Sequence, residues 1–456
     1  MSVAQPGVER RLLAGLVAAA VAIAFADSSI VVLALPELYG QFHTTIEGVA
    51  WVVTAYNVAV AVTALGLVLL VHRFNAAWVM AAGLVVFLGA SIACALAGYL
   101  EFLIGARVVQ GTGAALLLVG SLPVLGALTG SVGAGRRLWI LAGTFGLAVG
   151  PALGGVLTEA FSWRAIFAFQ APVAALGLLA LLHSHARAVA EEGWRESLVR
   201  TLPANVCLGL LFGALVGALF LAVLLVISVW GYSPIAGAAI VSALPLAAIA
   251  ARPLERRLPR LIAVCGGAML LSGGLVGLAL LPSASVGFAV WSLALCGAGL
   301  GLAIPVLSDT ALDESSGMTR SGTLTVGARH VGLVLALALI APLLASKVPA
   351  AGDRALLKAT AVLLDAPVGL DKKVPVALDL RGAFDSAQAG ETPDLAKPFD
   401  EHGAKHDPAL AATRNRLVGT IEATITRASR SSFFVCALFA AAALLVAVVF
   451  RRRVVS

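Results

Sequence analysis

Two ionisable residues, Asp27 and Arg107, stand inside long apolar stretches of this sequence. A charged side chain within a bilayer costs several kcal/mol, so each requires a partner or a role. A rise of 1.5 Å per residue places Asp27 about 13 Å and Arg107 about 9 Å below the same membrane surface. We therefore expect an ion pair across an interior cavity. It is either a structural salt bridge or, as we favour because buried pairs seldom add net stability, a proton-coupling site.

Other polar residues in apolar stretches are weaker candidates for a cavity or a gate. Arg329 could extend its guanidinium to the membrane surface, and His330 could either titrate near neutral pH or serve as a hydrogen-bonded packing residue. Asn57, Gln110 and Gln170 could face a cavity or bridge helices. The sequence contains no recognisable paired carboxylates, nucleophile–base set, metal cluster or nucleotide motif. It predicts neither an enzyme nor a cofactor.

A glycine-rich run places Gly146, Gly150 and Gly154 four residues apart on one helical face, and Gly155 follows directly. Small residues at this spacing let two membrane helices approach closely. Pro151 removes a backbone hydrogen bond and permits a kink. The pattern predicts a tightly packed helix.

The composition points to a membrane protein. Of the 456 residues, 60% are hydrophobic and only 12% are charged, and the mean hydropathy is +0.99. A soluble domain has about 25% charged residues, so a soluble enzyme, a nucleic-acid-binding protein and a disulfide-rich scaffold are excluded. The five cysteines all fall in apolar runs without metal or redox spacing, which predicts buried thiols.

Apolar segments long enough to cross a bilayer recur along the chain. Twelve are predicted, at about 11–35, 46–71, 77–98, 101–128, 138–159, 163–183, 205–229, 234–251, 261–281, 285–307, 322–345 and 432–450. If the N-terminus is cytoplasmic, sixteen arginines fall in the inner loops and only Arg164 in the short outer loops. This positive-inside bias predicts that both termini are cytoplasmic.

The predicted organisation is two helical bundles and an insert: an N-terminal six-helix bundle at 1–183, a polar cytoplasmic linker at 184–203, helices seven to eleven at 204–345, an extracytoplasmic and partly helical insert at 346–431, and helix twelve with a basic tail at 432–456.

Prolines and periodicity set the predictions for the insert. Pro342 and Pro349 should bend or end the eleventh helix, and 366–407 should be mainly loop. With Asp407 as N-cap and Pro408 at the first helical position, a single helix of about 43 residues and about 60 Å is expected to run through the twelfth span.

Several motifs occur in a fixed order along the chain: Phe25–Pro36 around Asp27, Trp51–Tyr56, Arg107–Ala115, the glycine run at 143–155, Ser162–Phe167, Gly231–Pro234 and Ala328–Gly332. In these motifs the sequence resembles the major facilitator superfamily, and within it the drug:proton antiporters related to the fourteen-helix branch. The resemblance covers nearly all of the chain except 346–431. It implies that Arg107 takes part in proton transfer and that the glycine run is the antiporter motif of helix five.

Three departures from that pattern matter. The linker at 184–203 is too short for two extra helices, so a twelve-helix relative is expected. In the loop 71–77, which helps the family close the cytoplasmic side, only Arg73 of the motif remains, and His72 takes one of its positions. The later loop at 252–260 is a partial copy that could carry more of the gating. The insert is also unusually long.

The resemblance implies an all-α fold of two six-helix bundles around a central cavity, with spans one, four, seven and ten as its lining. The apolar character of these spans favours hydrophobic or amphipathic cargo, either drug-like compounds or lipids. We expect a monomeric, proton-coupled exporter of the plasma membrane, with protons and membrane lipids as its other partners.

Alternatives remain open at this stage. One is a lipid or glycolipid transporter of the cell envelope without strict proton coupling. A second is a non-transporting receptor or scaffold that binds an extracytoplasmic partner through 346–431. A third is an uptake symporter of the same fold, because the fold alone does not set the direction of transport.

Overall fold

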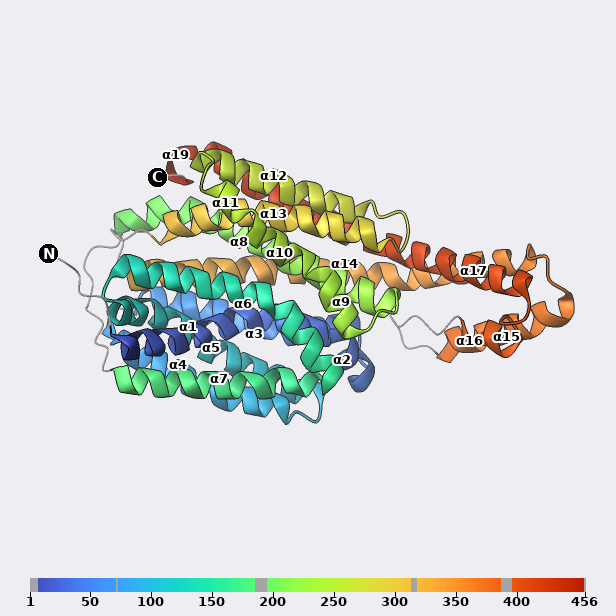
Figure 1. Ribbon diagram of the computed structural model, residues 1–456, viewed down its shortest axis with the longest axis horizontal. Helices are drawn as coiled ribbons and strands as arrows, with labels where there is room; N and C mark the ends of the chain where they lie inside the picture. The colour runs from blue at the N-terminus through green and yellow to red at the C-terminus, as the bar shows by residue number, and fades with distance from the viewer. Residues whose placement is uncertain (1–6, 71–72, 185–194, 313–317, 387–395, 455–456) are drawn as a thin grey trace.

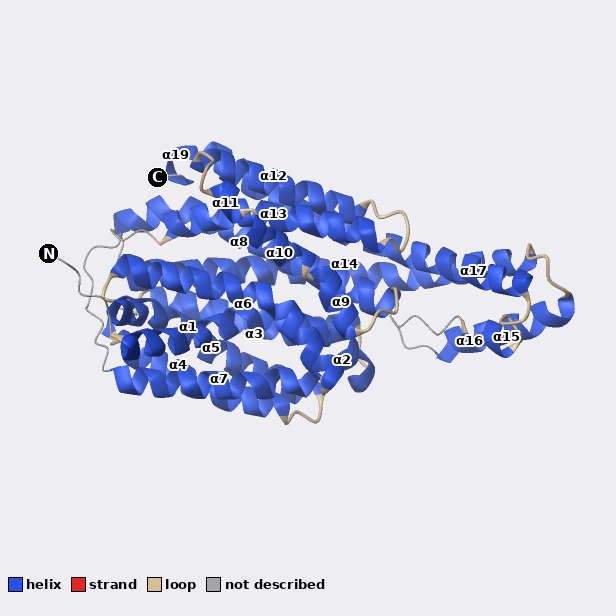
Figure 2. Cartoon of the chain, viewed as in Figure 1, coloured by secondary structure: helices blue, strands red, loops and turns tan. Residues whose placement is uncertain are grey.

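The computed structural model describes residues 7–70, 73–184, 195–312, 318–386 and 396–454. Within these ranges all regular secondary structure is helical (Figure 2). Among the residues described, twelve helices are long and apolar enough to cross a membrane, as the sequence predicts. The chain is therefore a multi-pass membrane protein of the all-α class.

The first six spans form one bundle. Its elements are α1 (Val8–Ile30), the 3₁₀ turn η1 (Val31–Ala34), α2 (Leu35–Phe42), α3 (Ile46–Val68), α4 (Ala76–Ala95), α5 (Leu100–Thr129), α6 (Val132–Ala160) and α7 (Trp163–Ser184). Thr45, Asn75 and Ser131 accept backbone hydrogen bonds at the starts of α3, α4 and α6. These short polar side chains satisfy donors that the first helical turn leaves free.

The other six spans form the second bundle. Its elements are α8 (Arg195–Val223), the π-helical turn η3 (Leu224–Val229), α9 (Pro234–Val241), α10 (Ala243–Ala250), α11 (Arg252–Glu255), α12 (Arg260–Ala279), α13 (Val286–Ala311), α14 (Met318–Leu364), α17 (Pro408–Thr426), η5 (Arg427–Ser429), α18 (Arg430–Val449) and α19 (Arg451–Val454). The start of α1 and the end of α19 lie at the same end of the molecule (Figure 1). Half of the predicted linker, 185–194, lies outside the described residues, and α8 begins within its last part.

The eleventh span continues far beyond its predicted end. Helix α14 has 47 residues and passes through both Pro342 and Pro349. Of the two predicted outcomes, a bend or an end of the helix at these prolines, the structure excludes the end. A proline in a helix removes one backbone hydrogen bond. Packing offsets this loss, because α14 contacts α3 and α8 within the bundles and α17 beyond them.

The segment after α14 folds back as a helical hairpin at the end of the molecule opposite the two chain ends (Figure 1). Its additional helices are α15 (Leu370–Ser386) and α16 (Lys397–Glu401). The prediction of a loop at 366–407 is therefore wrong for both. Val376, Leu380 and Phe399 are buried in a small core with residues of α14 and α17. That burial stabilises helices which the Pro- and Gly-rich sequence does not favour.

The predicted long helix that leads into the last span is confirmed. Helices α17 and α18 are joined by a single 3₁₀ turn, and together they cover 42 residues. The carboxylate of Asp407 accepts hydrogen bonds from the backbone nitrogens of Ala409 at 2.9 Å and Leu410 at 3.2 Å. Asp407 thus caps α17 as expected.

Candidate functional site

Asp27 and Arg107 form an ion pair inside the first bundle. Arg107 of α5 donates from Nη1 to Asp27 Oδ1 at 2.8 Å and from Nη2 to Asp27 Oδ2 at 2.6 Å. Its Nε donates to the backbone oxygen of Val52 at 2.9 Å. Both charged side chains are completely buried. A bidentate pair of this kind fixes both groups in direction as well as distance.

Two glutamines extend the pair into a polar network. Gln110 accepts from Arg107 Nη1 at 2.6 Å, and its Nε2 donates to Ser91 Oγ at 2.9 Å and to Gln170 Oε1 at 2.8 Å. Gln170 in turn donates to Asp27 Oδ1 at 2.9 Å. The network therefore ties α1, α3, α4, α5 and α7 together. Each nitrogen of the Arg107 guanidinium has an acceptor.

Aromatic rings close the space around this network. The Arg107 guanidinium carbon lies 4.3 Å from the ring centre of Tyr56 and 5.5 Å from that of Phe167. Cation–π attraction adds to the ion pair in such surroundings. The cavity that was expected between Asp27 and Arg107 is not found there, because the two side chains are in direct contact.

Asn57 lies outside this network. Its Oδ1 accepts from Ser28 Oγ at 3.0 Å, and its Nδ2 donates to the backbone oxygen of Val53 at 2.8 Å. The side chain thus bridges α1 and α3. This matches the helix-bridging alternative for Asn57.

The other two candidates are also placed by the structure. Arg73 is exposed in the loop after α3, and its side chain makes no ion pair with the described residues. His72 lies outside the described residues. His330 is buried, and its Nδ1 lies 2.8 Å from the backbone oxygen of Val326. This is the geometry of a hydrogen-bonded packing residue.

The glycine run packs α6 against α1. A methyl group at Gly146 would lie 2.1 Å from the backbone oxygen of Ala22, and one at Gly154 would lie 2.5 Å from that of Ile30. Gly150 leaves room for the Ser29 side chain in the same way. These helices therefore approach as closely as the spacing predicts.

Gly155 makes a different contact, across the two bundles. A methyl group there would lie 2.4 Å from the Cβ of Ala238 and 2.7 Å from the backbone oxygen of Pro234, both on α9. Pro151 lies on the wall of the cavity between the bundles. The run thus joins α1, α6 and the second bundle.

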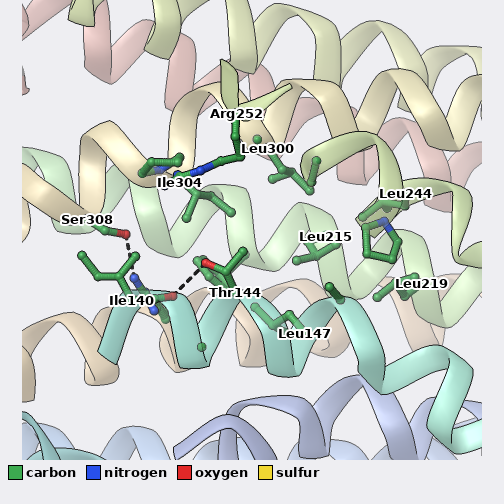
Figure 3. A pocket seen from close by; sticks show the side chains of 18 of the residues that line it. Ile140, Thr144, Leu147, Leu215, Leu219, Leu244, Arg252, Leu300, Ile304 and Ser308 are labelled. Atoms are coloured by element: carbon green, nitrogen blue, oxygen red, sulfur yellow. Dashed lines mark hydrogen bonds between the residues drawn. The ribbon is translucent and has the colours of Figure 1, made fainter. Parts of the chain in front are cut away.

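An apolar cavity of about 60 Å³ lies between the two bundles (Figure 3). Its wall comes from α6, α8, α10, α13 and single residues of α11 and α14: Ile140, Gly143, Thr144, Leu147, Ala148, Pro151, Phe212, Leu215, Leu219, Leu244, Pro245, Ala248, Arg252, Leu300, Gly301, Ile304, Pro305, Ser308 and Arg329. Spans seven and ten line it as expected. Residues of spans one and four are not part of this wall. For span one the reason is that the glycine contacts place α1 behind α6.

Arg329 and Arg252 are the charged residues of this wall. Arg329 is only 4% exposed, so of its two alternatives the structure favours the cavity over extension to the membrane surface. Its Nη2 instead donates to Ser308 Oγ at 2.8 Å. The sequence placed Arg252 in a loop and gave no role to Ser308. A hydroxyl one helical turn from an interior proline, Pro305, is too common to single out.

A charged clamp joins the bundles at the end where the chain termini lie. Asp309 of α13 pairs with Arg136 of α6 at 3.3 Å and with Arg260 of α12 at 3.1 Å, and Arg136 also donates to the backbone oxygen of Leu312. The later loop, through Arg260, therefore contributes to this contact. Sequence analysis missed Asp309; an acidic residue at the end of a span is its only signal.

The family model described as Major Facilitator Superfamily matches residues 17–345. Drug efflux pump JefA of Mycobacterium tuberculosis is 34% identical over 155 residues, which is 33% of this chain and 30% of JefA. Multidrug resistance protein Stp of the same species is 33% identical over 203 residues, 44% of this chain and 36% of Stp. The Bacillus subtilis methylenomycin A resistance protein is 32% identical over 193 residues, 42% of this chain and 41% of that protein. These matches thus span less than half the length of each relative.

Solved structures share the fold. A bacterial homologue of the human lysosomal transporter Spinster, in an inward-facing conformation, aligns with a TM-score of 0.60 and 16% identity over 96% of this chain and 98% of that one. A D-xylose-proton symporter aligns with a TM-score of 0.59 and 15% identity over 72% of this chain and 89% of that one. At these identities the likeness concerns the fold alone.

Proposed function

The chain belongs to the Major Facilitator Superfamily, a family of membrane transporters, and on that premise we propose that it exports hydrophobic or amphipathic molecules across the plasma membrane in exchange for protons. The observation that carries the proposal is the apolar cavity between the bundles. Ligand pockets usually enclose about 300–1,000 Å³, so this cavity must widen to hold a cargo. Alternating access would supply that movement.

Asp27 is the proposed proton carrier, and Arg107 its partner. The Asp27 carboxylate accepts hydrogen bonds from both terminal nitrogens of Arg107 and from Gln170. A proton on Asp27 would cancel the charge that holds Arg107 in place. A conformation that admits water to Asp27 would then favour protonation and release of the guanidinium. Proton binding and helix movement would in this way be linked.

Efflux relatives support export over uptake as the direction. We propose that both termini are cytoplasmic, because of the arginine distribution, and that the hairpin is extracytoplasmic. The fold is shared with a proton symporter, so direction needs its own measurement. In sealed vesicles, cargo and protons would move in opposite directions for an exporter and in the same direction for a symporter.

The first experiment is proton release from purified protein in a neutral detergent as hydrophobic drugs are added. Wild-type protein should release protons, and Asp27→Asn should not. Asp353→Asn is the matched control, because Asp353 is exposed on the part of α14 beyond the bundle. Cargo-driven release that persists in Asp27→Asn would overturn the assignment of the coupling site. Absence of both release and vesicle transport would favour the receptor or scaffold alternative.

A lipid cargo is the second candidate, because an apolar groove of about 660 Å³ runs along α1, α6 and α7. Leu141 and Phe145 on its wall are exposed at the surface of the protein. Such a groove could pass an acyl chain from the membrane. Exchange of labelled lipid between vesicle leaflets, with and without a proton gradient, distinguishes this candidate from drug export.

A further inference from the structure

Within the described part of the chain, the guanidinium of Arg329 is buried without a carboxylate partner. Its Nη2 donates a hydrogen bond to Ser308, and its Nε has no hydrogen-bond partner among the same residues. No acidic side chain of the described residues forms an ion pair with it. Because taking a cation out of water is expensive, an unpaired buried guanidinium is an unusual feature in a membrane span.

Aromatic rings compensate for part of this cost. The guanidinium carbon lies 4.7 Å from the ring centre of Phe212 and 5.6 Å from those of Phe25 and Trp139. Ring faces attract a cation but supply no hydrogen-bond acceptor in the plane of the guanidinium. The Nε donor therefore remains available to an oxygen acceptor.

Arg252 places a second cation on the wall of the same cavity. Its Nη1 makes no hydrogen bond, and the nearest recorded carboxylate oxygen, of Glu255, lies 4.0 Å away. Among the residues that the structure describes, no acidic side chain lines the cavity. The charged side chains that these residues contribute to the wall are therefore both positive, and the rest of the wall is mostly apolar.

One end of the cavity is apolar, and the polar side chains lie away from it. In the close view Leu219 and Leu244 lie at the right, Arg252 lies near the middle, and Ser308 lies at the left beside the apolar Ile304 and Ile140 (Figure 3). A molecule that fits this arrangement has one charged group and an apolar body.

We infer that the cavity takes a cargo with a single anionic oxygen group, a carboxylate or a phosphate, held by Arg329 and assisted by Ser308 and Arg252. The apolar part of the cargo would lie against Leu215, Leu219 and Leu244. This inference rests on the proposed transport function and names the chemical class of its substrate. A planar guanidinium is well suited to two parallel hydrogen bonds with either anion.

The test compares naphthalene compounds that share the same ring system and differ in the attached polar group. Binding of 2-naphthoate, naphthyl phosphate, naphthalenemethanol and naphthylmethylammonium is measured by calorimetry on full-length protein in a neutral detergent. Wild-type protein should bind at least one anion about tenfold or more tightly than the alcohol, as expected for a charge-assisted hydrogen bond. The cation should bind most weakly. Equal affinities for anions and alcohol, or a preference for the cation, would overturn the inference.

Variants then locate the anion. Arg329→Gln should lose the preference for anions, and Arg329→Lys should keep part of it. Arg257→Gln is the matched control, since Arg257 is exposed and outside the cavity wall, and it should bind like wild type. Each variant must unfold at the wild-type temperature to be counted. A full preference for anions in a folded Arg329→Gln would overturn the assignment.

Competition measurements distinguish a lipid headgroup from a free anion as the ligand. Comparison with the proton-release experiment distinguishes failure of the substrate inference from failure of the transport proposal. If lipid headgroups bind at Arg329, anionic glycerophospholipid in nanodiscs should compete with naphthyl phosphate for binding. If the anion alone is enough for binding there, inorganic phosphate should compete as well. If proton release by uncharged drugs depends on Asp27 but no anion is preferred, only the substrate inference fails. If no cargo releases protons while anions still bind at Arg329, the transport proposal fails instead.

Discussion

Two buried arginines, Arg107 and Arg329, differ in the number of polar partners that surround their guanidinium groups. Arg107 in the first bundle has an acceptor for each guanidinium nitrogen and a bidentate carboxylate partner. Arg329 at the interface of the bundles has one recorded hydrogen bond, to Ser308, and no carboxylate partner among the described residues. Both side chains are almost completely buried. Burial alone therefore does not distinguish a matched charge from an unmatched one.

The difference teaches where each charge can act. A matched pair in a low dielectric stabilises one arrangement of helices, and any change at either partner leaves the other exposed to the full cost of burial. An unmatched cation in a cavity leaves its best interaction free for a ligand. Helix α6 lies between the two regions, since its glycine face packs on α1 and its other face lines the cavity.

The largest predicted effect is a difference in stability between variants of the two arginines. Arg107→Leu should lower the free energy of unfolding by about 3–5 kcal/mol, because it leaves the Asp27 carboxylate buried without its partner. Arg329→Leu should be neutral or stabilising, because it removes a buried charge that has no ion partner. Unfolding of purified protein in detergent measures both. Equal losses in the two variants would contradict the comparison.

A double-mutant cycle sharpens this first prediction. Asp27→Asn in the Arg107→Leu background removes the remaining charge, so it should recover part of the lost stability. The two single changes should therefore not add. Strict additivity would mean that the pair contributes little as a pair.

A smaller effect is expected at the helix contact between the two regions. Gly146→Ala should lower the free energy of unfolding by about 1–3 kcal/mol through overpacking, since its methyl group meets the backbone of Ala22. Gly89→Ala is the control, because an added methyl there meets nothing within 4 Å. It should be neutral or stabilise α4 by up to about 1 kcal/mol. If both variants behave alike, close packing of α6 on α1 is not what holds these helices.

Removal of an exposed ion pair should have a smaller effect on the free energy of unfolding. Asp309 is 43% exposed and pairs with Arg136 and Arg260, so Asp309→Asn should cost about 1 kcal/mol or less. The difference from wild type should shrink in high salt, which screens exposed charges. If the loss of stability in Asp309→Asn were the same at low and high salt, the Asp309 ion pairs would be shielded from solvent like the pair of Asp27 and Arg107, which would contradict the prediction.

The smallest effect is a pH dependence in the hairpin. The hydrogen bond from Lys372, at 2.7 Å, and the backbone donors of α17 hold the pKa of Asp407 below its usual 3.8, and Asp407 raises the pKa of Lys372 above 10.5. Because the pKa of Asp407 is lowered, ionised Asp407 stabilises the hairpin above pH 3.8, and this stabilisation is lost as the pH falls through the lowered pKa. Because the pKa of Lys372 is raised, charged Lys372 stabilises the hairpin below pH 10.5, and this stabilisation is lost as the pH rises through the raised pKa.

Protection of the first turn of α17 against hydrogen exchange measures this pair. At neutral pH, Asp407→Asn should reduce the protection, because it removes the ion pair and weakens the cap. The variant should also show little of the loss that wild type shows when the pH falls below about 4. Wild-type protection that does not change below that pH would contradict the assignment.

Sequence alone determined the fold to a large extent. Twelve apolar segments required twelve spanning helices, since a backbone in a bilayer must satisfy its own hydrogen bonds. The depths of Asp27 and Arg107 were sufficient to predict their pairing, because few charges occur within the spans and each needs a partner. The spacing of Gly146, Gly150 and Gly154 likewise fixed which face of α6 packs closely.

Only the tertiary structure decided the rest. Pro342 and Pro349 are locally unfavourable in a helix, and contacts with helices distant in sequence outweigh that preference. Whether Arg329 reaches water or enters a cavity depends on which helix lies beside α14, and local sequence carries no information about that neighbour. The glycine contact of α6 with α1 removes α1 from the cavity wall, so the expectation that span one lines the cavity fails. Hydropathy determines which segments are buried away from water, and this can be predicted from the sequence. The packing of helices that are distant in sequence determines which buried residues contact one another.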